Sequence, residues 1–120
     1  MAARHPFDAV RRAGLSLPDV EAATRYDGAP VLRVGGAFMA ALASHPSAEP
    51  DSLVVRIRPE DRDLLLEEAP DTYYVTPYYE PHPVVLVRLA RIDREALRDL
   101  LGTARRATLE KAAGTRPSQS

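Results

Sequence analysis

The stretch Thr72-Tyr-Tyr-Val-Thr-Pro-Tyr-Tyr-Glu-Pro-His-Pro-Val-Val-Leu-Val-Arg-Leu89 decides the fold of this chain. It holds four of the five tyrosines and three prolines. Residues 73–76 and 84–89 have the composition of short strands, and a loop punctuated by prolines separates them. A helix is predicted directly afterwards, from Arg94 to about Lys111, with Asp93 as its N-cap. Its apolar stripe has helical spacing and consists of Leu97, Leu100, Leu101, Ala104 and Thr108.

The residues before this stretch predict a hairpin of two strands, a further strand and two helices. A hairpin is expected from 31–34 and 37–43, because Gly35 and Gly36 supply the positive φ angles of a two-residue turn. Residues 53–58 alternate as a strand. Pro59 then suits the first position of a helix, which Leu64, Leu65 and Leu66 anchor and Pro70 ends. At the N-terminus a helix is expected over 7–13, ended by Gly14.

The order of these elements predicts an α+β fold. Short connections favour a mostly antiparallel sheet with the helices gathered on one face, a two-layer sandwich whose other sheet face is uncovered. At 120 residues the chain is long enough for one domain, which we expect over residues 1–113, with a disordered tail over residues 114–120.

Composition excludes several classes of function. The net charge is −1 and the pI is near 6.3, so there is no general attraction to nucleic acid or acidic membranes. Without cysteine there is no disulfide and no thiolate metal site. No apolar run approaches the length of a membrane span, and the N-terminus lacks a signal-peptide core. A cytoplasmic protein with no membrane partner is therefore expected.

Arginines form the first candidate site. Arg56 and Arg58 share one face of their strand by alternation, and Arg33 and Arg88 could join them on the uncovered sheet face, edged by Tyr73, Tyr78 and Tyr79. Such a surface would suit phosphate contacts and stacking. On the last helix Arg94, Arg98 and Arg105 form a stripe that could follow a phosphate backbone. The alternative is that the strand arginines pair with neighbouring acids and the helix arginines lay their stems over the core edge.

The tyrosine pairs form a second candidate site. Wherever the chain is extended, Tyr73–Tyr74 and Tyr78–Tyr79 each place one ring on either side of the backbone, so one of each pair is expected in the core. Tyr74, Tyr78 and Tyr79 are the candidates for an aromatic loop that forms a pocket wall or contacts a partner.

Catalytic and metal chemistry has little support. His5, His45 and His82 each precede a proline, and none has a second ligand at helical spacing. Glu80 and His82 could form an acid/base pair, but an incidental loop pair is the simpler reading. The acidic helix, which begins at Glu60, uses its first carboxylates to offset the helix dipole. We expect no metal, no cofactor and no enzymatic activity.

The ordered set of motifs resembles the MmcQ/YjbR family of small bacterial proteins over about residues 5–110. The matching pieces are Leu17-Pro-Asp-Val20, Thr24-x-Tyr-Asp-Gly28-x-Pro30, Val34-Gly-Gly36, Leu53-Val-Val-Arg-Ile-Arg-Pro-Glu60, Tyr74-Val-Thr-Pro-Tyr78 and Val85-Leu-Val-Arg-Leu89. The resemblance implies a two-layer fold like that of the frataxin homologue CyaY. It also implies DNA binding, the label commonly given to the family on the strength of a proposed double-wing arrangement.

The chain departs from the family pattern at two positions. Tyr78 stands where a histidine often follows Thr-Pro, and Val84 stands where a tryptophan often precedes the last strand. Both departures fall in or beside the tyrosine loop and argue against base stacking there. The sequence thus favours a non-enzymatic binding module that contacts DNA through the uncovered sheet face and the last helix. The alternative is a protein–protein or small-ligand module that uses the tyrosine loop.

Overall fold

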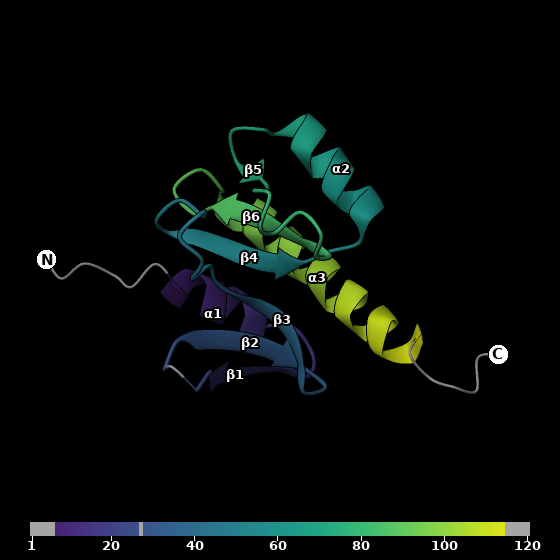
Figure 1. The fold of residues 1–120 in the computed structure, drawn as a ribbon. Helices are drawn as coiled ribbons and strands as arrows, with labels where there is room; N and C mark the ends of the chain where they lie inside the picture. Colours follow the sequence, from purple (N-terminus) through teal and green to yellow (C-terminus); the bar gives the residue numbers. More distant parts are fainter. Residues whose placement is uncertain (1–6, 27, 115–120) are drawn as a thin grey trace, which may run out of the picture.

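The computed structural model describes residues 7–26 and 28–114, which form three helices and one six-stranded sheet (Figure 1). All paired strands are antiparallel, in the order β1-β2-β3-β4-β6-β5. The final helix runs through Gly114, and residues 115–120 of the expected tail lie outside the described residues. The elements are α1 (Phe7–Leu15), β1 (Val20–Thr24), β2 (Pro30–Val34), β3 (Ala37–Leu42), β4 (Ser52–Arg56), α2 (Pro59–Glu68), β5 (Tyr73–Tyr74), β6 (Val84–Arg88) and α3 (Arg94–Gly114).

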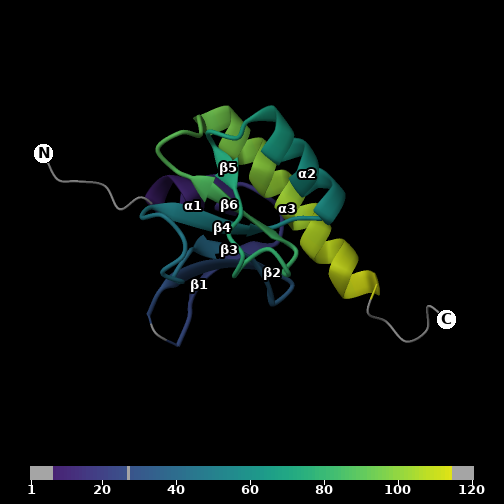
Figure 2. The same ribbon diagram turned by 45° about the horizontal axis from the view of Figure 1, so that its top comes forward.

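The three helices lie on one face of the sheet, so the predicted two-layer α+β fold is confirmed (Figures 1 and 2). α1 and α3 pack against each other. α1 covers β1 and β2, α3 covers β2, β3 and β4, and α2 lies beside β5 and β6. The main core fills the space between these layers. It contains four members of the predicted stripe of α3, namely Leu97, Leu100, Leu101 and Ala104, and the fifth, Thr108, is buried as well. None of the helices in the described part of the chain has the length and apolar character needed to cross a membrane.

The predicted glycine turn joins β2 to β3. Gly35 and Gly36 have φ angles of +59° and +78°, which is the backbone that a two-residue hairpin turn requires and that side chains disfavour. The register shifts by one residue between Leu32 and Arg33, so β2 and β3 are paired with an irregularity beside the turn.

Three local predictions were wrong for physical reasons. α1 continues through Gly14, where the buried Leu32 side chain packs so closely that an added Cβ would lie 2.5 Å from its Cδ1. Leu64 does not anchor α2, since it is 54% exposed and only Leu65 and Leu66 reach the core. β4 ends at Arg56, because Pro59 opens α2 and Arg58 is its N-cap residue.

The sheet face opposite the helices is not uncovered, as the sequence had suggested. Two loops, residues 43–51 between β3 and β4 and residues 75–83 between β5 and β6, lie over part of it. They close a second, smaller core whose buried members come from four strands and one loop. These members are Val31, Ala41, Val54, Tyr79, Val84 and Leu86. A protein of this size therefore buries apolar groups on both faces of one sheet.

Candidate functional site

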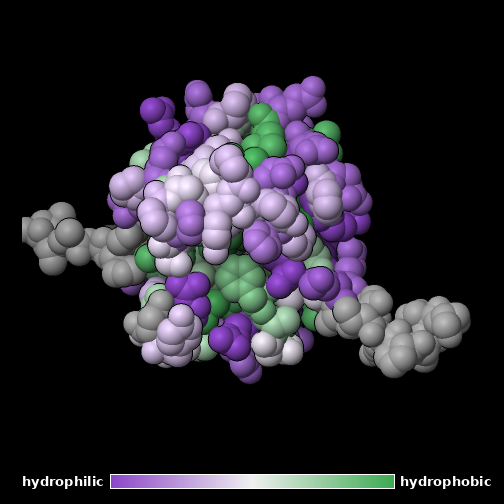
Figure 3. Space-filling model, viewed as in Figure 1, coloured by the Kyte–Doolittle hydropathy of each residue, from purple (hydrophilic) through white to green (hydrophobic). Residues whose placement is uncertain are grey.

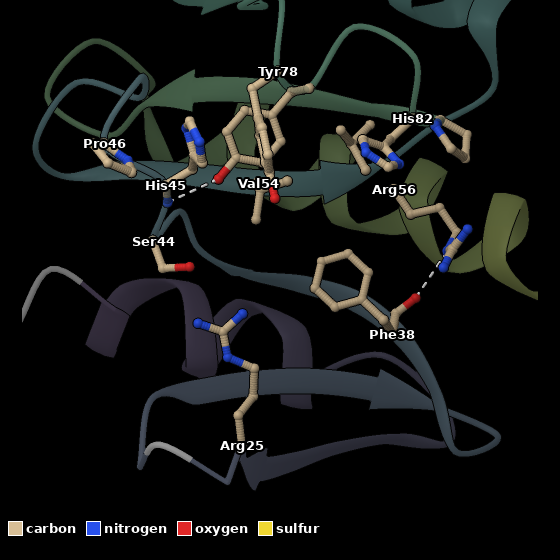
Figure 4. A pocket seen from close by; sticks show the side chains of 12 residues that line it. Arg25, Phe38, Ser44, His45, Pro46, Val54, Arg56, Tyr78 and His82 are labelled. Carbon is tan, nitrogen blue, oxygen red and sulfur yellow. Dashed lines mark hydrogen bonds between the residues drawn. The ribbon is translucent and has the colours of Figure 1, made fainter.

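A hollow of about 550 Å³ opens on the sheet face opposite the helices, between the two loops and the β1–β2 hairpin (Figures 3 and 4). Figure 3 shows a hydrophobic floor near the middle of this face, surrounded by hydrophilic groups. The hollow lies within the usual size range of small-ligand pockets. The side chains that give it chemical character are Arg25, Phe38, His45, Arg56, Tyr78, Tyr79 and His82.

The lining of the hollow is cationic. Two arginines and two histidines contribute to it, and none of the described lining residues is an aspartate or a glutamate. Arg56 is the clearest cation: its Nε donates to the backbone oxygen of Phe38 at 3.0 Å, and its Cζ lies 5.7 Å from the Phe38 ring centroid. Burial lowers the pKa of the Arg56 guanidinium. No carboxylate of the described residues pairs with this desolvated charge.

An aromatic cluster forms one wall. The Tyr78 ring lies flat on the His45 imidazole, with centroids 3.5 Å apart and planes 10° from parallel. Tyr79 is buried and meets Tyr78 edge-on at 5.0 Å. The Tyr79 hydroxyl accepts a hydrogen bond of 3.2 Å from the His45 backbone N–H. This bond connects the buried Tyr79 to the His45–Tyr78 stack.

The two loops that carry this wall are fixed to each other and to the helix layer. The hydroxyls of Ser47 and Thr76 are 2.9 Å apart and join loop 43–51 to loop 75–83. On the other side Arg62 of α2 donates through Nη1 to three carbonyl oxygens of the second loop and β6, those of Glu80, His82 and Val84. The wall is thus held in place without a ligand, which lowers the entropic cost of binding one.

The predicted arginine surface on the sheet does not form as one patch. Arg56 lines the hollow, but Arg88 pairs with Ser52 in the β4–β6 register and so lies about 13 Å further along the sheet. Arg88 is also occupied by the Glu49 carboxylate. Arg58 turns toward Asp61 and Glu110 instead of the sheet face, with Nε 3.0 Å from the Asp61 carboxylate.

Arg33 and the helix arginines are also separate from the hollow. Arg33 lies on β2 beside Phe38 in the register, but it is not among the residues that line the hollow. Arg94 and Arg98 line a groove between α1 and α3, in the layer on the far side of the sheet. Arg105 donates to the Pro18 carbonyl oxygen. The predicted sites on the sheet face and on the last helix are therefore two surfaces on opposite sides of the molecule.

The two tyrosine pairs divide between the core and the surface. Each pair has one core member, Tyr73 and Tyr79, and one more exposed member, Tyr74 and Tyr78. Tyr73 does not edge the open face, because it belongs to the main core on the helix side. Tyr78 and Tyr79 line the hollow. Tyr74 lies nearby, under the guanidinium of Arg88, whose Cζ is 4.2 Å from the ring centroid.

Sequence reasoning missed half of the site. Arg25 follows the end of β1, and Phe38 comes from β3, for which the sequence predicted a hairpin strand and no site residue. His45 was noted only as a loop residue before a proline, and its partnership with Tyr78 joins positions 33 residues apart. Local residue spacing cannot predict the His45–Tyr78 pair, because the order of strands in the sheet is what brings loop 43–51 next to loop 75–83.

The acid/base and metal readings can be compared with the geometry. Glu80 and His82 are both exposed, and their side chains share no hydrogen bond among the described contacts. In residues 7–26 and 28–114 no three histidine, aspartate or glutamate side chains are grouped closely enough to hold a metal ion. His5 lies outside the described residues.

Comparisons with known proteins agree with the resemblance. The family model described as YjbR matches residues 15–107, which is most of the chain. The chain belongs to the YjbR family. Its relatives include the uncharacterized protein Rv2570 of Mycobacterium tuberculosis and the uncharacterized protein Mb2600 of Mycobacterium bovis, each 34% identical over 67 residues. That match covers 53% of this chain and 52% of each relative, so the chain spans about half the length of the curated relatives it matches. No solved structure matches the chain.

Proposed function

We propose that this YjbR-family protein is a non-enzymatic, cytoplasmic binding module whose site is the hollow on the sheet face opposite the helices, and whose ligand carries an anionic group. The observation that carries the proposal is the desolvated Arg56 guanidinium in a hollow whose described lining contains no carboxylate. A partly buried guanidinium with no carboxylate beside it has lost some of its hydration, and an incoming phosphate or carboxylate would compensate that loss. Arg25, His45 and His82 add donors around the same space.

The absence of enzymatic activity is part of the proposal. Bond-breaking chemistry at neutral pH commonly needs a general acid or base aimed at one reacting atom. The hollow offers donors and rings, and the one acid/base pair suggested by sequence, Glu80 with His82, has no mutual hydrogen bond. Cytoplasmic location fits a chain without cysteine.

Single-stranded DNA is the second candidate ligand. It is favoured by the half-exposed Tyr78 ring, because aromatic side chains beside cations bind unpaired strands without base preference. A duplex site that joins the sheet face to α3 has less support. Arg88 and Arg58 are paired with carboxylates, and Arg94, Arg98 and Arg105 belong to the opposite layer.

The proposal is tested by following backbone amide signals of the ¹⁵N-labelled protein during titration with inorganic phosphate and pyrophosphate. Signals of loop 43–51, loop 75–83 and the end of β4 should shift together. Arg56→Ala should weaken pyrophosphate binding about tenfold or more, because a hydrogen bond to a charged group is lost. Arg106→Ala removes an exposed arginine from α3, on the other layer, and is the charge-matched control.

A second titration addresses the strand. Fluorescence anisotropy with a labelled thymidine 12-mer and a 12-base-pair duplex, each in low and physiological salt, separates a stacking site from general phosphate attraction. Preference for the single strand that Arg56→Ala abolishes would favour the second candidate. Shifts spread evenly over the surface, or equal losses in both arginine variants, would overturn a site in the hollow.

A further inference from the structure

Tyr78 presents one free ring face to the hollow. His45 covers the other face in a close parallel stack, yet the tyrosine remains 51% exposed. The nearest ring on the free side is His82, whose centroid is 6.2 Å away and whose plane is tilted by 50°, so it does not stack on Tyr78. Figure 4 shows His45 on one side of Tyr78, and Arg56 and His82 on the other.

This tyrosine is held as a rigid platform. Tyr79 supports both members of the stack edge-on, at 5.0 Å from Tyr78 and 6.1 Å from His45. His45 is fixed in turn, since its Nδ1 lies 2.9 Å from the Ser47 hydroxyl and 3.0 Å from the Ser47 backbone N–H. A flat ring ligand would therefore extend an existing stack without ordering new side chains.

The free face of the Tyr78 ring and the Arg56 guanidinium, which has no carboxylate partner among the described residues, occupy the same hollow. Arg56 and His82 both line it together with Tyr78, and all three side chains are drawn around one space in Figure 4. A guanidinium and an imidazole N–H are donors that phosphate oxygens accept. The arrangement fits a molecule with a planar ring at one end and a phosphate at the other.

We propose that the hollow binds a nucleotide, whose base stacks on the face of Tyr78 opposite His45 and whose phosphate pairs with Arg56 and His82. This inference rests on the proposed anion-binding function and adds that the ligand also carries a planar base, which stacks on Tyr78. Every base has a π-face, so the site should tolerate different bases. A hollow of about 550 Å³ has room for one nucleotide. The same chemistry is offered by a free mononucleotide and by one residue of a single strand.

The test is isothermal titration calorimetry of the full chain with four ligands: adenosine 5′-monophosphate, ribose 5-phosphate, adenosine and a deoxyadenosine 6-mer. Stacking on an aromatic side chain should make the monophosphate bind about 5- to 100-fold more tightly than ribose 5-phosphate. Tyr78→Leu should remove that difference. Tyr26→Leu replaces a fully exposed tyrosine that does not line the hollow and should change neither affinity.

A measurement on the unaltered protein keeps the inference falsifiable if Tyr78→Leu does not fold. Protons H2 and H8 of bound adenine should shift upfield and give nuclear Overhauser contacts to the Tyr78 ring. If ribose 5-phosphate binds as tightly as the monophosphate, the ring plays no part and the inference is overturned, while the anion site stands. If no phosphate binds, both fail. If the 6-mer binds no more tightly than the monophosphate, the ligand is a free nucleotide. If the 6-mer binds much more tightly and its affinity also depends on Tyr78, the ligand is a single strand.

Discussion

Arg88 of β6 holds Glu49 of the β3–β4 loop through two parallel hydrogen bonds, with Nε 2.9 Å from Oε1 and Nη2 2.8 Å from Oε2. The same guanidinium lies over the Tyr74 ring and donates through Nη1 to the carbonyl oxygens of Pro70 and Asp71. One arginine therefore joins β6, loop 43–51 and the segment that leads into β5. Strand alternation had suggested Arg88 as a DNA contact, but in the structure this side chain connects three segments of the fold.

The first prediction separates Arg88 from Arg56. Arg88→Ala should lower the free energy of unfolding by about 1–2 kcal/mol, because it removes a stacked cation and hydrogen bonds to a carboxylate and two carbonyls. Urea denaturation followed by circular dichroism measures this. Pyrophosphate binding in the hollow should be unchanged. Arg56→Ala is the matched variant and should have the opposite profile, with weakened binding and a smaller loss of stability. Equal effects of both variants on binding would contradict this division of roles.

The second prediction concerns acid pH. The hydrogen bond from Arg88 holds the pKa of the Glu49 carboxyl below its ordinary value near 4.5. Because the folded-state pKa is the lower one, the charged pair stabilises the fold above pH 4.5, and this stabilisation is lost as the pH falls through the folded-state pKa.

The experiment compares urea midpoints of the unaltered protein and Glu49→Gln from neutral pH down to about pH 3. The difference between them should be constant near neutrality and should shrink below pH 4.5. Both partners are partly exposed, so added salt should also reduce it. A difference that persists unchanged at the acid end would mean that the amide variant loses packing and not charge.

The third prediction concerns the Tyr74 hydroxyl. It accepts a hydrogen bond of 2.8 Å from the Glu49 backbone N–H and is bonded to the hydroxyl of Ser52, a buried residue at the start of β4. Tyr74→Phe leaves the ring in place but leaves Ser52 unpaired, at a cost of about 1–3 kcal/mol.

Hydrogen exchange locates this effect. The Glu49 amide should exchange faster in Tyr74→Phe. The exchange rates of amides in the middle of α3 should change only as far as the global free energy of unfolding changes. Tyr26→Phe is the control, because its fully exposed side chain can lose a hydroxyl without leaving a buried group unpaired. An unchanged Glu49 exchange rate would show that the Tyr74 hydroxyl does not hold the loop at Glu49.

Local sequence patterns predicted the elements whose causes are local. The stripe from Leu97 to Thr108 and the Gly35–Gly36 turn depend on helical spacing and on positive φ, and both appear as expected. The course of β4 beyond Arg56 was mispredicted because two signals compete there. Strand alternation continues to Arg58, while Pro59 commits the preceding residue to an N-cap, and the helix signal wins.

The site could be predicted only in part. Tyr78 and Tyr79 stood out by composition, and Arg56 by alternation. Their relation to Arg25, Phe38 and His45 depends on the order of strands in the sheet, which brings the β1–β2 hairpin, loop 43–51 and loop 75–83 around one hollow. The departure at Tyr78 from the family pattern keeps a flat ring at that position. The sequence argued against base stacking in the tyrosine loop, but it gave no sign that His45 stacks on Tyr78.

The fourth prediction uses two glycines in helices. Gly14 of α1 lies so close to the buried Leu32 that an added Cβ would be 2.5 Å from its Cδ1, whereas at Gly102 of α3 the nearest atom, Nη1 of Arg106, is 4.0 Å away. Alanine gains about 1 kcal/mol over glycine in a helix, but overpacking a filled core costs about 1–3 kcal/mol. Gly102→Ala should therefore raise the thermal midpoint, and Gly14→Ala should lower it. Differential scanning calorimetry of the two variants gives the comparison. If both variants were stabilised, Leu32 would have room to change its rotamer, and the contact between α1 and β2 would be looser than its geometry indicates.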